Sequence, residues 1–252
     1  MPPNSSSPCR ERGTVLADTI IKSETCRNEH GTFWSACSLR GTNREQNSDA
    51  LAVSGEGPWR IFVVADGVGA LEGSPRASDA AALAAARWAA GRDDVSPADV
   101  TSFIESVDLA VRAAVREDPG GTTLACALIG PGDGLVLTVG DSEALAVGSD
   151  GPARRLTPID HLPNQPNMLL AWIDGKVEVE PHVVALVSMP YRLVLATDGV
   201  TGALDKAAIA DIVRAAPVNA AAAQLVEAAR ASGAIDDASA IVIAAPPNGV
   251  IA

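Results

Sequence analysis

The stretch that decides the fold is IFVVADG, residues 61–67, in which five apolar residues run directly into Asp66 and Gly67. A β-branched and aromatic run of this length predicts a buried strand, and the Asp-Gly pair predicts the turn that ends it. Residues 193–199, LVLATDG, show the same arrangement and end in Asp198 and Gly199. Each predicted strand therefore delivers a carboxylate to the edge of a sheet.

Two further aspartates stand beside apolar runs. Asp49 precedes ALAV, residues 50–53, and Asp236 is paired with Asp237 shortly before IVI, residues 241–243. Mg²⁺ and Mn²⁺ prefer oxygen ligands in octahedral geometry and leave room for retained waters. Four carboxylates at sheet edges therefore indicate a metal-dependent hydrolase, although a lone Asp-Gly pair after a strand is more often a simple hairpin turn.

The composition narrows the class of partner. Of the 252 residues, 47% are apolar, and 19 Lys and Arg against 31 Asp and Glu leave a net charge of −12. So acidic a chain is repelled by a phosphate backbone, and we expect no nucleic-acid partner. No apolar run approaches the ~20 residues of a membrane span and the polar N-terminus has no signal core, so we expect no membrane partner and a cytoplasmic location.

Cysteine and histidine are not arranged for zinc. The cysteines form no C-x-x-C pair and the histidines are not spaced as zinc ligands. The residues concerned are Cys9, Cys26, Cys37, Cys126, His30, His161 and His182. The chemistry is therefore expected to rest on oxygen ligands, with Cys126 as a buried apolar residue inside a strand.

Apolar periodicity and turn residues predict the secondary structure. Strands are expected at residues 32–39, 50–53, 60–65, 122–129, 135–139, 144–147, 183–187, 192–197 and 240–244, and helices at 77–90, 97–117, 206–215 and 219–232. Turn sequences at 130–134 and 140–142 predict that the three strands between 122 and 147 form one antiparallel meander.

This order of elements predicts an α+β fold. Strands, two helices, strands, two helices and a last strand suit a four-layer αββα sandwich, in which two antiparallel sheets face each other and helix pairs cover both outer faces. We expect residues 1–12 to be a flexible tail and residues 13–252 to form a single domain. Residues 150–182, which contain several prolines, are the least regular part.

Six short motifs, taken in order, resemble the PPM (PP2C-type) family of metal-dependent serine/threonine protein phosphatases. They are GTNREQNSD (41–49), VADGVG (64–69), GTTL (121–124), GDS (140–142), TDGV (197–200) and DDAS (236–239). The family patterns are similar: G-x-x-R-x-x-N-x-D, A-D-G-M-G-G, G-T-T-L, G-D-S, S-D-G-L and D-N-x-T. Each motif alone is weak, but the ordered set spans most of the chain.

The resemblance implies a site for two Mg²⁺ or Mn²⁺ ions. Asp66 would bridge the two ions and the Gly67 backbone carbonyl would bind one of them. Asp198 and Asp236 would complete the shell of the other ion. Such a pair of ions neutralises a phosphate monoester and activates a water molecule that attacks it directly, without a phospho-enzyme.

The resemblance assigns outer roles to further residues. Asp49 would hold an ion-bound water, and Asp141 would help to hold a third, weaker ion, although Asp141 and the serine after it also suit a plain turn. Arg44 would clamp the substrate phosphate, because a guanidinium offers a fork of donors. For His161, in a segment similar to the family's T-x-D-H, we expect a local structural role.

The chain also departs from the family pattern. Ser48 stands where Glu or Gln is usual, and Glu143 replaces an arginine and so reverses a charge near the site. Val68 occupies a place where many relatives have histidine, which leaves the general acid unassigned. The helical flap of bacterial relatives is expected to be reduced within residues 150–182. Trp172, in its remnant, suits a core position or a partner contact.

The leading hypothesis is hydrolysis of phosphoserine or phosphothreonine in proteins by a water that two Mg²⁺ or Mn²⁺ ions activate. A phosphorylated protein substrate is the expected partner, with a kinase or its target as a further candidate. Alternatives are a catalytically weak pseudophosphatase that binds a regulatory partner, a small-molecule phosphatase, and a phosphatase of a phosphorylated anti-sigma-factor antagonist. The sequence does not separate the three hydrolase hypotheses.

Overall fold

The structure is a computed structural model that describes residues 21–22, 33–54, 59–69, 71–162, 164–188 and 190–244. The expected tail at 1–12 lies outside this part of the chain, as do Cys9, Cys26 and His30. Cys37 and Cys126 are free thiols, and both are buried, as expected for Cys126.

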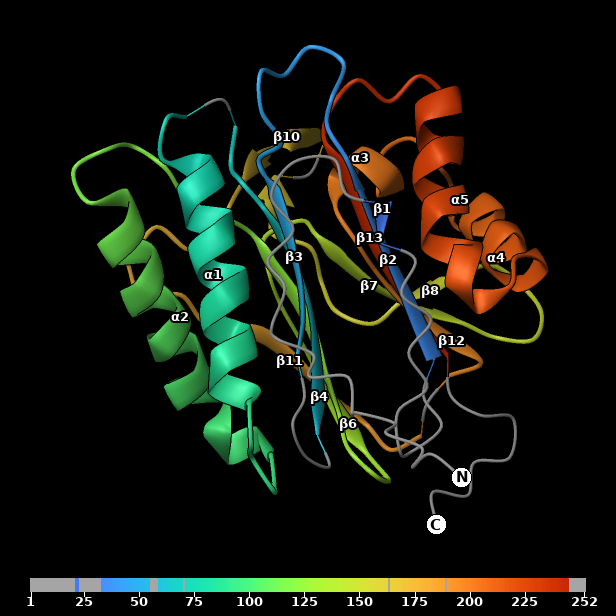
Figure 1. Cartoon of the computed structure of the whole chain (residues 1–252), viewed down its shortest axis with the longest axis horizontal. Helices are drawn as coiled ribbons and strands as arrows, with labels where there is room; N and C mark the ends of the chain where they lie inside the picture. Colours follow the sequence, from blue (N-terminus) through green and yellow to red (C-terminus); the bar gives the residue numbers. More distant parts are fainter. Residues whose placement is uncertain are drawn as a thin grey trace, which may run out of the picture.

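Two antiparallel sheets face each other at the centre of the molecule (Figure 1). The five-stranded sheet has the order β11-β6-β5-β4-β3 and contains β3 (Asp49–Ser54), β4 (Arg60–Asp66), β5 (Leu124–Ile129), β6 (Gly134–Val139) and β11 (His182–Leu186). The six-stranded sheet has the order β1-β2-β13-β12-β7-β8 and contains β1 (Ile21–Lys22), β2 (Phe33–Leu39), β7 (Glu143–Val147), β8 (Arg154–Arg155), β12 (Arg192–Ala196) and β13 (Ala238–Ala244).

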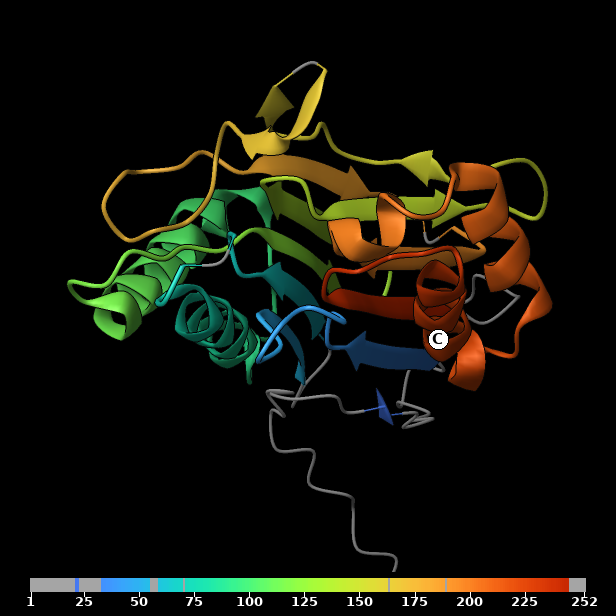
Figure 2. The same ribbon diagram turned by 90° about the horizontal axis from the view of Figure 1, so that it is seen from above.

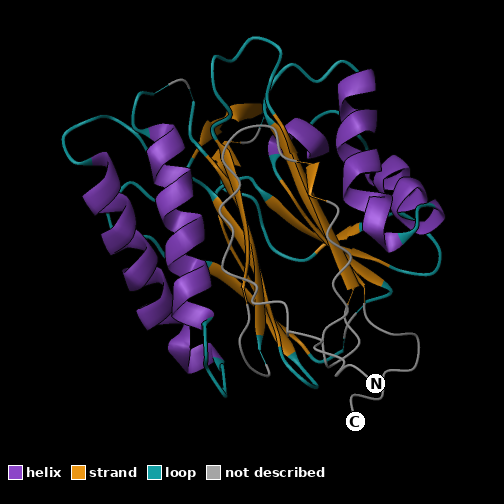
Figure 3. Cartoon of the chain, in the orientation of Figure 1, coloured by secondary structure: helices purple, strands orange, loops and turns teal. Residues whose placement is uncertain are grey.

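Helix pairs cover the outer faces of both sheets (Figure 3). The five-stranded sheet is covered by α1 (Ser74–Ala89) and α2 (Val100–Val115), which follows the 3-10 turn η1 (Pro97–Asp99). The six-stranded sheet is covered by α4 (Lys206–Ala215) and α5 (Val218–Ala231). The four-layer αββα prediction is therefore confirmed. The short helix α3 (Asp198–Thr201), which the sequence analysis did not anticipate, begins at one of the candidate ligands.

The alternation of side chains along β4 explains why its whole sequence is apolar. Ile61, Val63 and Ala65 belong to the core under α1 and α2, whereas Phe62 and Val64 belong to the core between the sheets. Both faces of the strand are thus buried, and successive side chains point to opposite faces. By the same alternation, Asp66 continues the row of Phe62 and Val64 at the end of the inter-sheet layer.

The predicted meander is wrong in its last step. β5 and β6 form a hairpin in the five-stranded sheet, but β7 pairs with β12 and β8 in the six-stranded sheet. Residues 140–142 therefore carry the chain from one sheet to the other. Gly140 has a positive φ of +92°, and a Cβ there would lie 2.7 Å from the side chain of Thr123. A turn sequence shows where a strand ends, but not which strand the next one joins.

Strands replace the helical flap. Between residues 150 and 182 the described residues contain β8, β9 (His161–Leu162) and β10 (Gln165–Leu169) but no helix. Figure 2 shows the β9–β10 hairpin projecting away from the layers. The region in which a reduced flap was expected thus forms short strands in its described residues. No helix in the described ranges is long and apolar enough to cross a bilayer.

Replacing Gly199 by alanine tests how closely α3 packs on β13. A Cβ at Gly199 would lie 1.9 Å from the backbone oxygen of Asp237, so we expect Gly199→Ala to lower the free energy of unfolding by about 1–3 kcal/mol. Urea denaturation measures it. Gly132→Ala is the matched control, because its Cβ meets nothing within 4 Å. Equal stability of the two variants would contradict the close packing.

Candidate metal centre

Two carboxylates stand opposite each other where β3 and β4 pair. Asp49 and Asp66 are register partners in this antiparallel ladder. Directly opposed side chains in such a ladder have Cβ atoms roughly 4.5–5.5 Å apart, and like charges in these positions destabilise the pair. A countercharge is therefore needed at this end of the sandwich.

The six-stranded sheet brings a third carboxylate to the same place. Asp198, at the start of α3, places its carboxyl group close enough to that of Asp66 for the two groups to interact. Burial, and then the charge of Asp49 with those of other aspartates, raises the pKa of Asp66 well above its usual value. Burial and the charge of Asp236 raise the pKa of Asp198 in the same direction. Two carboxyl groups in contact share a proton, or a cation takes the place of that proton.

Asp49 is buried, and one of its oxygens has no partner. Only 1% of the residue is exposed. Oδ2 accepts hydrogen bonds from Ser239 Oγ at 2.7 Å and Thr197 Oγ1 at 3.1 Å, whereas Oδ1 has none. Burial raises the pKa of Asp49 to about 8. A buried acceptor without a donor is unfavourable, so Oδ1 suits a bound cation or the water of one.

Asp141 reaches the cluster from the crossover between the sheets. Burial raises its pKa to about 7, the charge of Asp198 adds to this shift, and His161 acts in the opposite direction. Asp141 is thus close enough to Asp198 and His161 for their charges to change its pKa. The next side chain, Ser142 Oγ, lies 2.7 Å from Thr123 Oγ1 and ties the crossover to the start of β5.

Arg44 and Asp236 form an ion pair at the exposed side of the cluster. Asp236 Oδ1 accepts from Arg44 Nε at 2.9 Å and Nη2 at 2.6 Å, and from the Asp237 amide at 2.9 Å. These donors all meet Oδ1, which leaves Oδ2 for a cation. Arg44 Nη1 also donates to the Gly69 carbonyl at 3.2 Å. The predicted phosphate clamp therefore lies beside the carboxylates and is already engaged with one of them.

Gly67 occupies a position where only glycine fits. A Cβ there would lie 2.8 Å from the carbonyl oxygen of Ser48 and 2.9 Å from that of Ser74. The Gly67 amide donates to the Ser48 carbonyl at 3.0 Å. This packing fixes the peptide that follows Asp66. Ser48 thus acts through its backbone here, whereas the sequence analysis considered only its side chain.

Asp237 is a functional position that the sequence analysis missed. Its buried carboxylate accepts from the Gly41 amide at 2.6 Å and the Ser48 amide at 2.8 Å, so it holds both ends of the loop that carries Arg44. A signal was present in the sequence. Side chains alternate between the two faces of a strand, so Asp237 lies on the same inter-sheet face as Ser239 and Ile241. Asp236 is one residue away and therefore belongs to the opposite face.

Glu143 does not reverse the charge near the site. It is buried and lies 2.7 Å from both Arg155 Nε and Lys206 Nζ. Burial acts to raise the pKa of Glu143, but the hydrogen bonds from Arg155 and Lys206 outweigh it and lower the pKa. Two cations surround one carboxylate, so the local charge stays positive, which corrects the expectation from the sequence.

His161 and Trp172 lie on the side of the flap. His161 Nδ1 is 3.0 Å from the Leu162 carbonyl, in keeping with a local role. Trp172 is 37% exposed, and a Cβ at Gly121 would lie 2.6 Å from its ring. The indole thus packs on the GTTL segment with one side open, which is neither a full core position nor a free surface side chain.

The residues present fit divalent cations. No three His, Cys, Asp or Glu side chains in the described ranges are placed to hold one ion by themselves. Mg²⁺, however, usually keeps several waters and is bound through only one or two carboxylates plus substrate phosphate. The neighbouring carboxyl groups of Asp66 and Asp198, the unpartnered Oδ1 of Asp49 and the second oxygen of Asp236, which accepts none of the hydrogen bonds found within the described ranges, meet that smaller requirement.

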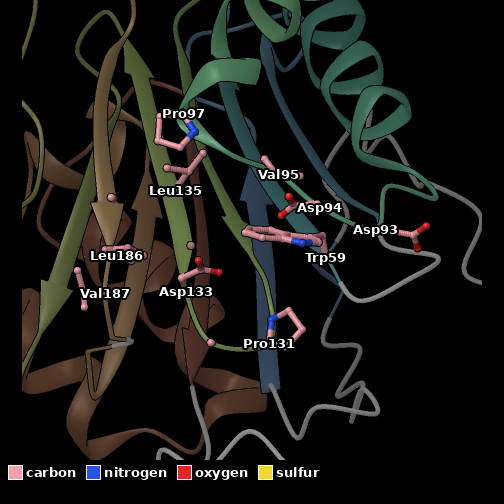
Figure 4. A pocket seen from close by; sticks show the side chains of 13 residues that line it. Trp59, Asp93, Asp94, Val95, Pro97, Pro131, Asp133, Leu135, Leu186 and Val187 are labelled. Carbon is pink, nitrogen blue, oxygen red and sulfur yellow. The ribbon is translucent and has the colours of Figure 1, made fainter.

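A separate cavity lies at the end of the five-stranded sheet that is farther from Asp66. Its volume is about 600 Å³, and it is lined by Trp59, at the start of β4, and Leu135, near the start of β6. Figure 4 shows Asp93, Asp94 and Asp133 on separate parts of its rim. The length of β4, roughly 20 Å, separates this cavity from Asp66. It contributes nothing to the carboxylate cluster.

The sequence model of the protein phosphatase 2C family matches residues 40–236, which contain all seven predicted ligand and clamp residues. The chain belongs to the protein phosphatase 2C family. The recognition made from the six motifs is confirmed, and the family match ends at Asp236. No curated protein sequence matches the chain.

Solved structures of phosphatases share the fold. The serine/threonine phosphatase Stp1 from Staphylococcus aureus is 18% identical with a TM-score of 0.75, covering 84% of this chain and 94% of its own. The serine/threonine phosphatase PstP/Ppp from Mycobacterium tuberculosis is 22% identical with a TM-score of 0.71, covering 84% and 98%. The catalytic domain of PstP, in a complex with two manganese ions, is 22% identical with a TM-score of 0.72, covering 84% and 97%.

The raised pKa values predict how pH acts on the metal-free protein. Asp49 and Asp141 have folded-state pKa values of about 8 and about 7, above the ~4 of an unfolded aspartate. Between these limits the folded state binds more protons, so stability falls as pH rises from about 4 to 8. Because Mn²⁺ needs deprotonated ligands, we expect it to raise the melting temperature more at pH 8 than at pH 6.

Scanning calorimetry at both pH values, with and without MnCl₂, measures this. Asp49→Asn removes one titrating group and should flatten the pH dependence of the metal-free protein. Asp118→Asn is the control, because Asp118 is an exposed residue paired with Arg76. A metal-free protein that gained stability between pH 5 and 8 would contradict the carboxylate repulsion.

Proposed function

We propose that the chain removes phosphate from phosphoserine and phosphothreonine in proteins, using two Mg²⁺ or Mn²⁺ ions. The observation that carries the proposal is the meeting of Asp66 and Asp198 from opposite sheets, with Asp49, Asp141 and Asp236 around them. Membership of the protein phosphatase 2C family supports the same reaction class. The proposal keeps the cytoplasmic location expected from the sequence.

The reaction explains why so much negative charge is gathered in one place. A phosphate monoester is a dianion, and its uncatalysed hydrolysis is among the slowest known reactions. When bound, divalent ions would neutralise the ester and lower the pKa of a water molecule. Asp66 and the Gly67 carbonyl would hold one of the two metal ions, and Asp198 and Asp236 would hold the other. Oδ1 of Asp49 would orient a water by accepting its proton in a hydrogen bond.

Arg44 suits the phosphate oxygens. Its guanidinium is held at the edge of the cluster by Asp236 and the Gly69 carbonyl, and its loop is fixed at both ends by Asp237. A guanidinium presents five donors, so it can share an Asp236 oxygen and still meet a phosphate. Arg44 would therefore do two things: orient Asp236 and bind the substrate.

The compensated charge of Glu143 speaks against the pseudophosphatase alternative. That hypothesis rested in part on a reversed charge near the site, and Arg155 and Lys206 balance it. The candidate ligands are also all present in the cluster. We therefore favour turnover over binding alone.

Hydrolysis of p-nitrophenyl phosphate tests the proposal. The purified protein should turn over the ester with MnCl₂ and stop with EDTA. Loss of a partner of a metal ligand alone costs roughly 10–100-fold, so Asp66→Asn should cost more than about 100-fold. Asp118→Asn makes the same chemical change at the surface and should leave the rate unaltered. Absence of metal-stimulated turnover on this ester and on phosphopeptides would refute the proposal.

The double role of Arg44 gives a second prediction. Arg44→Ala should raise KM for p-nitrophenyl phosphate, because a charged donor pair to the phosphate is lost. It should also weaken Mn²⁺ binding in calorimetry without substrate, because Asp236 loses the donors that orient it. Arg76→Ala, which breaks an exposed pair, is the control. If Arg44→Ala bound Mn²⁺ with unchanged affinity, Arg44 would serve only to bind the substrate phosphate and not to orient Asp236.

A further inference from the structure

An open cleft of about 360 Å³ has two of the candidate ligands, Asp198 and Asp236, among its lining residues. One wall is formed by Gly202 and Ala203 at the end of α3, and the other by Ser232 and Gly233 just after α5. A water molecule occupies about 30 Å³ of the liquid, so the volume suits a chain segment rather than a single solvated ion.

The walls of the cleft are preformed. Gly199, with no room for a Cβ, sets α3 directly against the start of β13. On the other wall, the Gly233 amide donates to the Arg230 carbonyl at 3.1 Å and Gly233 has a φ of +96°. Arg230 donates from its guanidinium to the carbonyls of Ala234 and Asp236, which fixes the backbone of this lining segment. A ligand therefore meets a fixed shape.

The lining selects the class of ligand. Small residues predominate, and Ile235, 63% exposed, is the largest apolar side chain. No aromatic residue is available among the described lining residues to stack on a nucleobase, and no apolar pocket is present to take an acyl chain. Small side chains let another backbone approach closely, which suits an extended polypeptide.

We propose that this cleft binds the substrate polypeptide on one side of the phosphorylated residue and favours small residues there. The inference rests on the proposed function, since a phosphate at the carboxylate cluster places the adjoining residues at the mouth of the cleft. Binding at this distance from the reacting bond adds to kcat/KM for a peptide. A small ester such as p-nitrophenyl phosphate does not reach it.

Two variants narrow the cleft from opposite walls. Ser232→Trp adds bulk at an exposed residue whose side chain makes no hydrogen bond within the described part of the chain. Ala203→Leu adds bulk in the turn that follows α3. Ala231→Trp is the matched control, because Ala231 is the exposed neighbour of Ser232 and does not line the cleft. Melting temperatures verify that each variant is folded.

The readout is the ratio of kcat/KM for the peptide Ala-Ala-phosphothreonine-Ala-Ala to that for p-nitrophenyl phosphate. We expect at least one wall variant to lower this ratio tenfold or more, and Ala231→Trp to leave it unchanged. Wild-type protein should also prefer this peptide to versions with tryptophan on both sides of the phosphothreonine. An unchanged ratio in both folded wall variants would overturn the cleft assignment while leaving phosphatase activity intact. Failure of the wild type on both substrates would instead refute the proposed function and the cleft with it.

Discussion

Repulsion between carboxylates at the end of the sandwich is the constraint on which the site depends. Asp49 and Asp66 face each other in one ladder, and Asp198 is brought against Asp66 from the other sheet. Charges of one sign at such distances raise each other's pKa and destabilise the fold unless a cation or protons compensate them. The apolar packing of the strands supplies the free energy that keeps these groups together.

The surrounding polar residues hold that arrangement without neutralising it. Thr197 and Ser239 fix one oxygen of Asp49, and Asp237 fixes the loop of Arg44 through two backbone amides. These neutral donors orient the carboxylates but leave the net charge of the cluster unchanged. In contrast, Glu143, the first residue of β7, is compensated by the two cations Arg155 and Lys206. Of the two buried carboxylates Asp49 and Glu143, Asp49 has only neutral donors among its hydrogen-bond partners in the described part of the chain.

The sequence predicted the layers and the carboxylates better than the connections between them. The runs before Asp66 and Asp198 are apolar because both strand faces are buried, and this pattern is local. The step of β7 into the other sheet is not local, because it depends on which edge accepts the strand. Asp237 and the partners of Glu143 also escaped prediction, since their roles depend on residues far away in the sequence.

The crossover at residues 140–142 has a mechanical consequence. Asp49 and Asp66 belong to one sheet, and Asp198 begins just after a strand of the other, so a shared ligand would tie the two halves of the sandwich at one rim. Elsewhere the halves are held by the apolar layer between them, which does not depend on ions. Loss of that ligand would then weaken the contact between the two sheets at this end of the sandwich, where residues 140–142 still connect them.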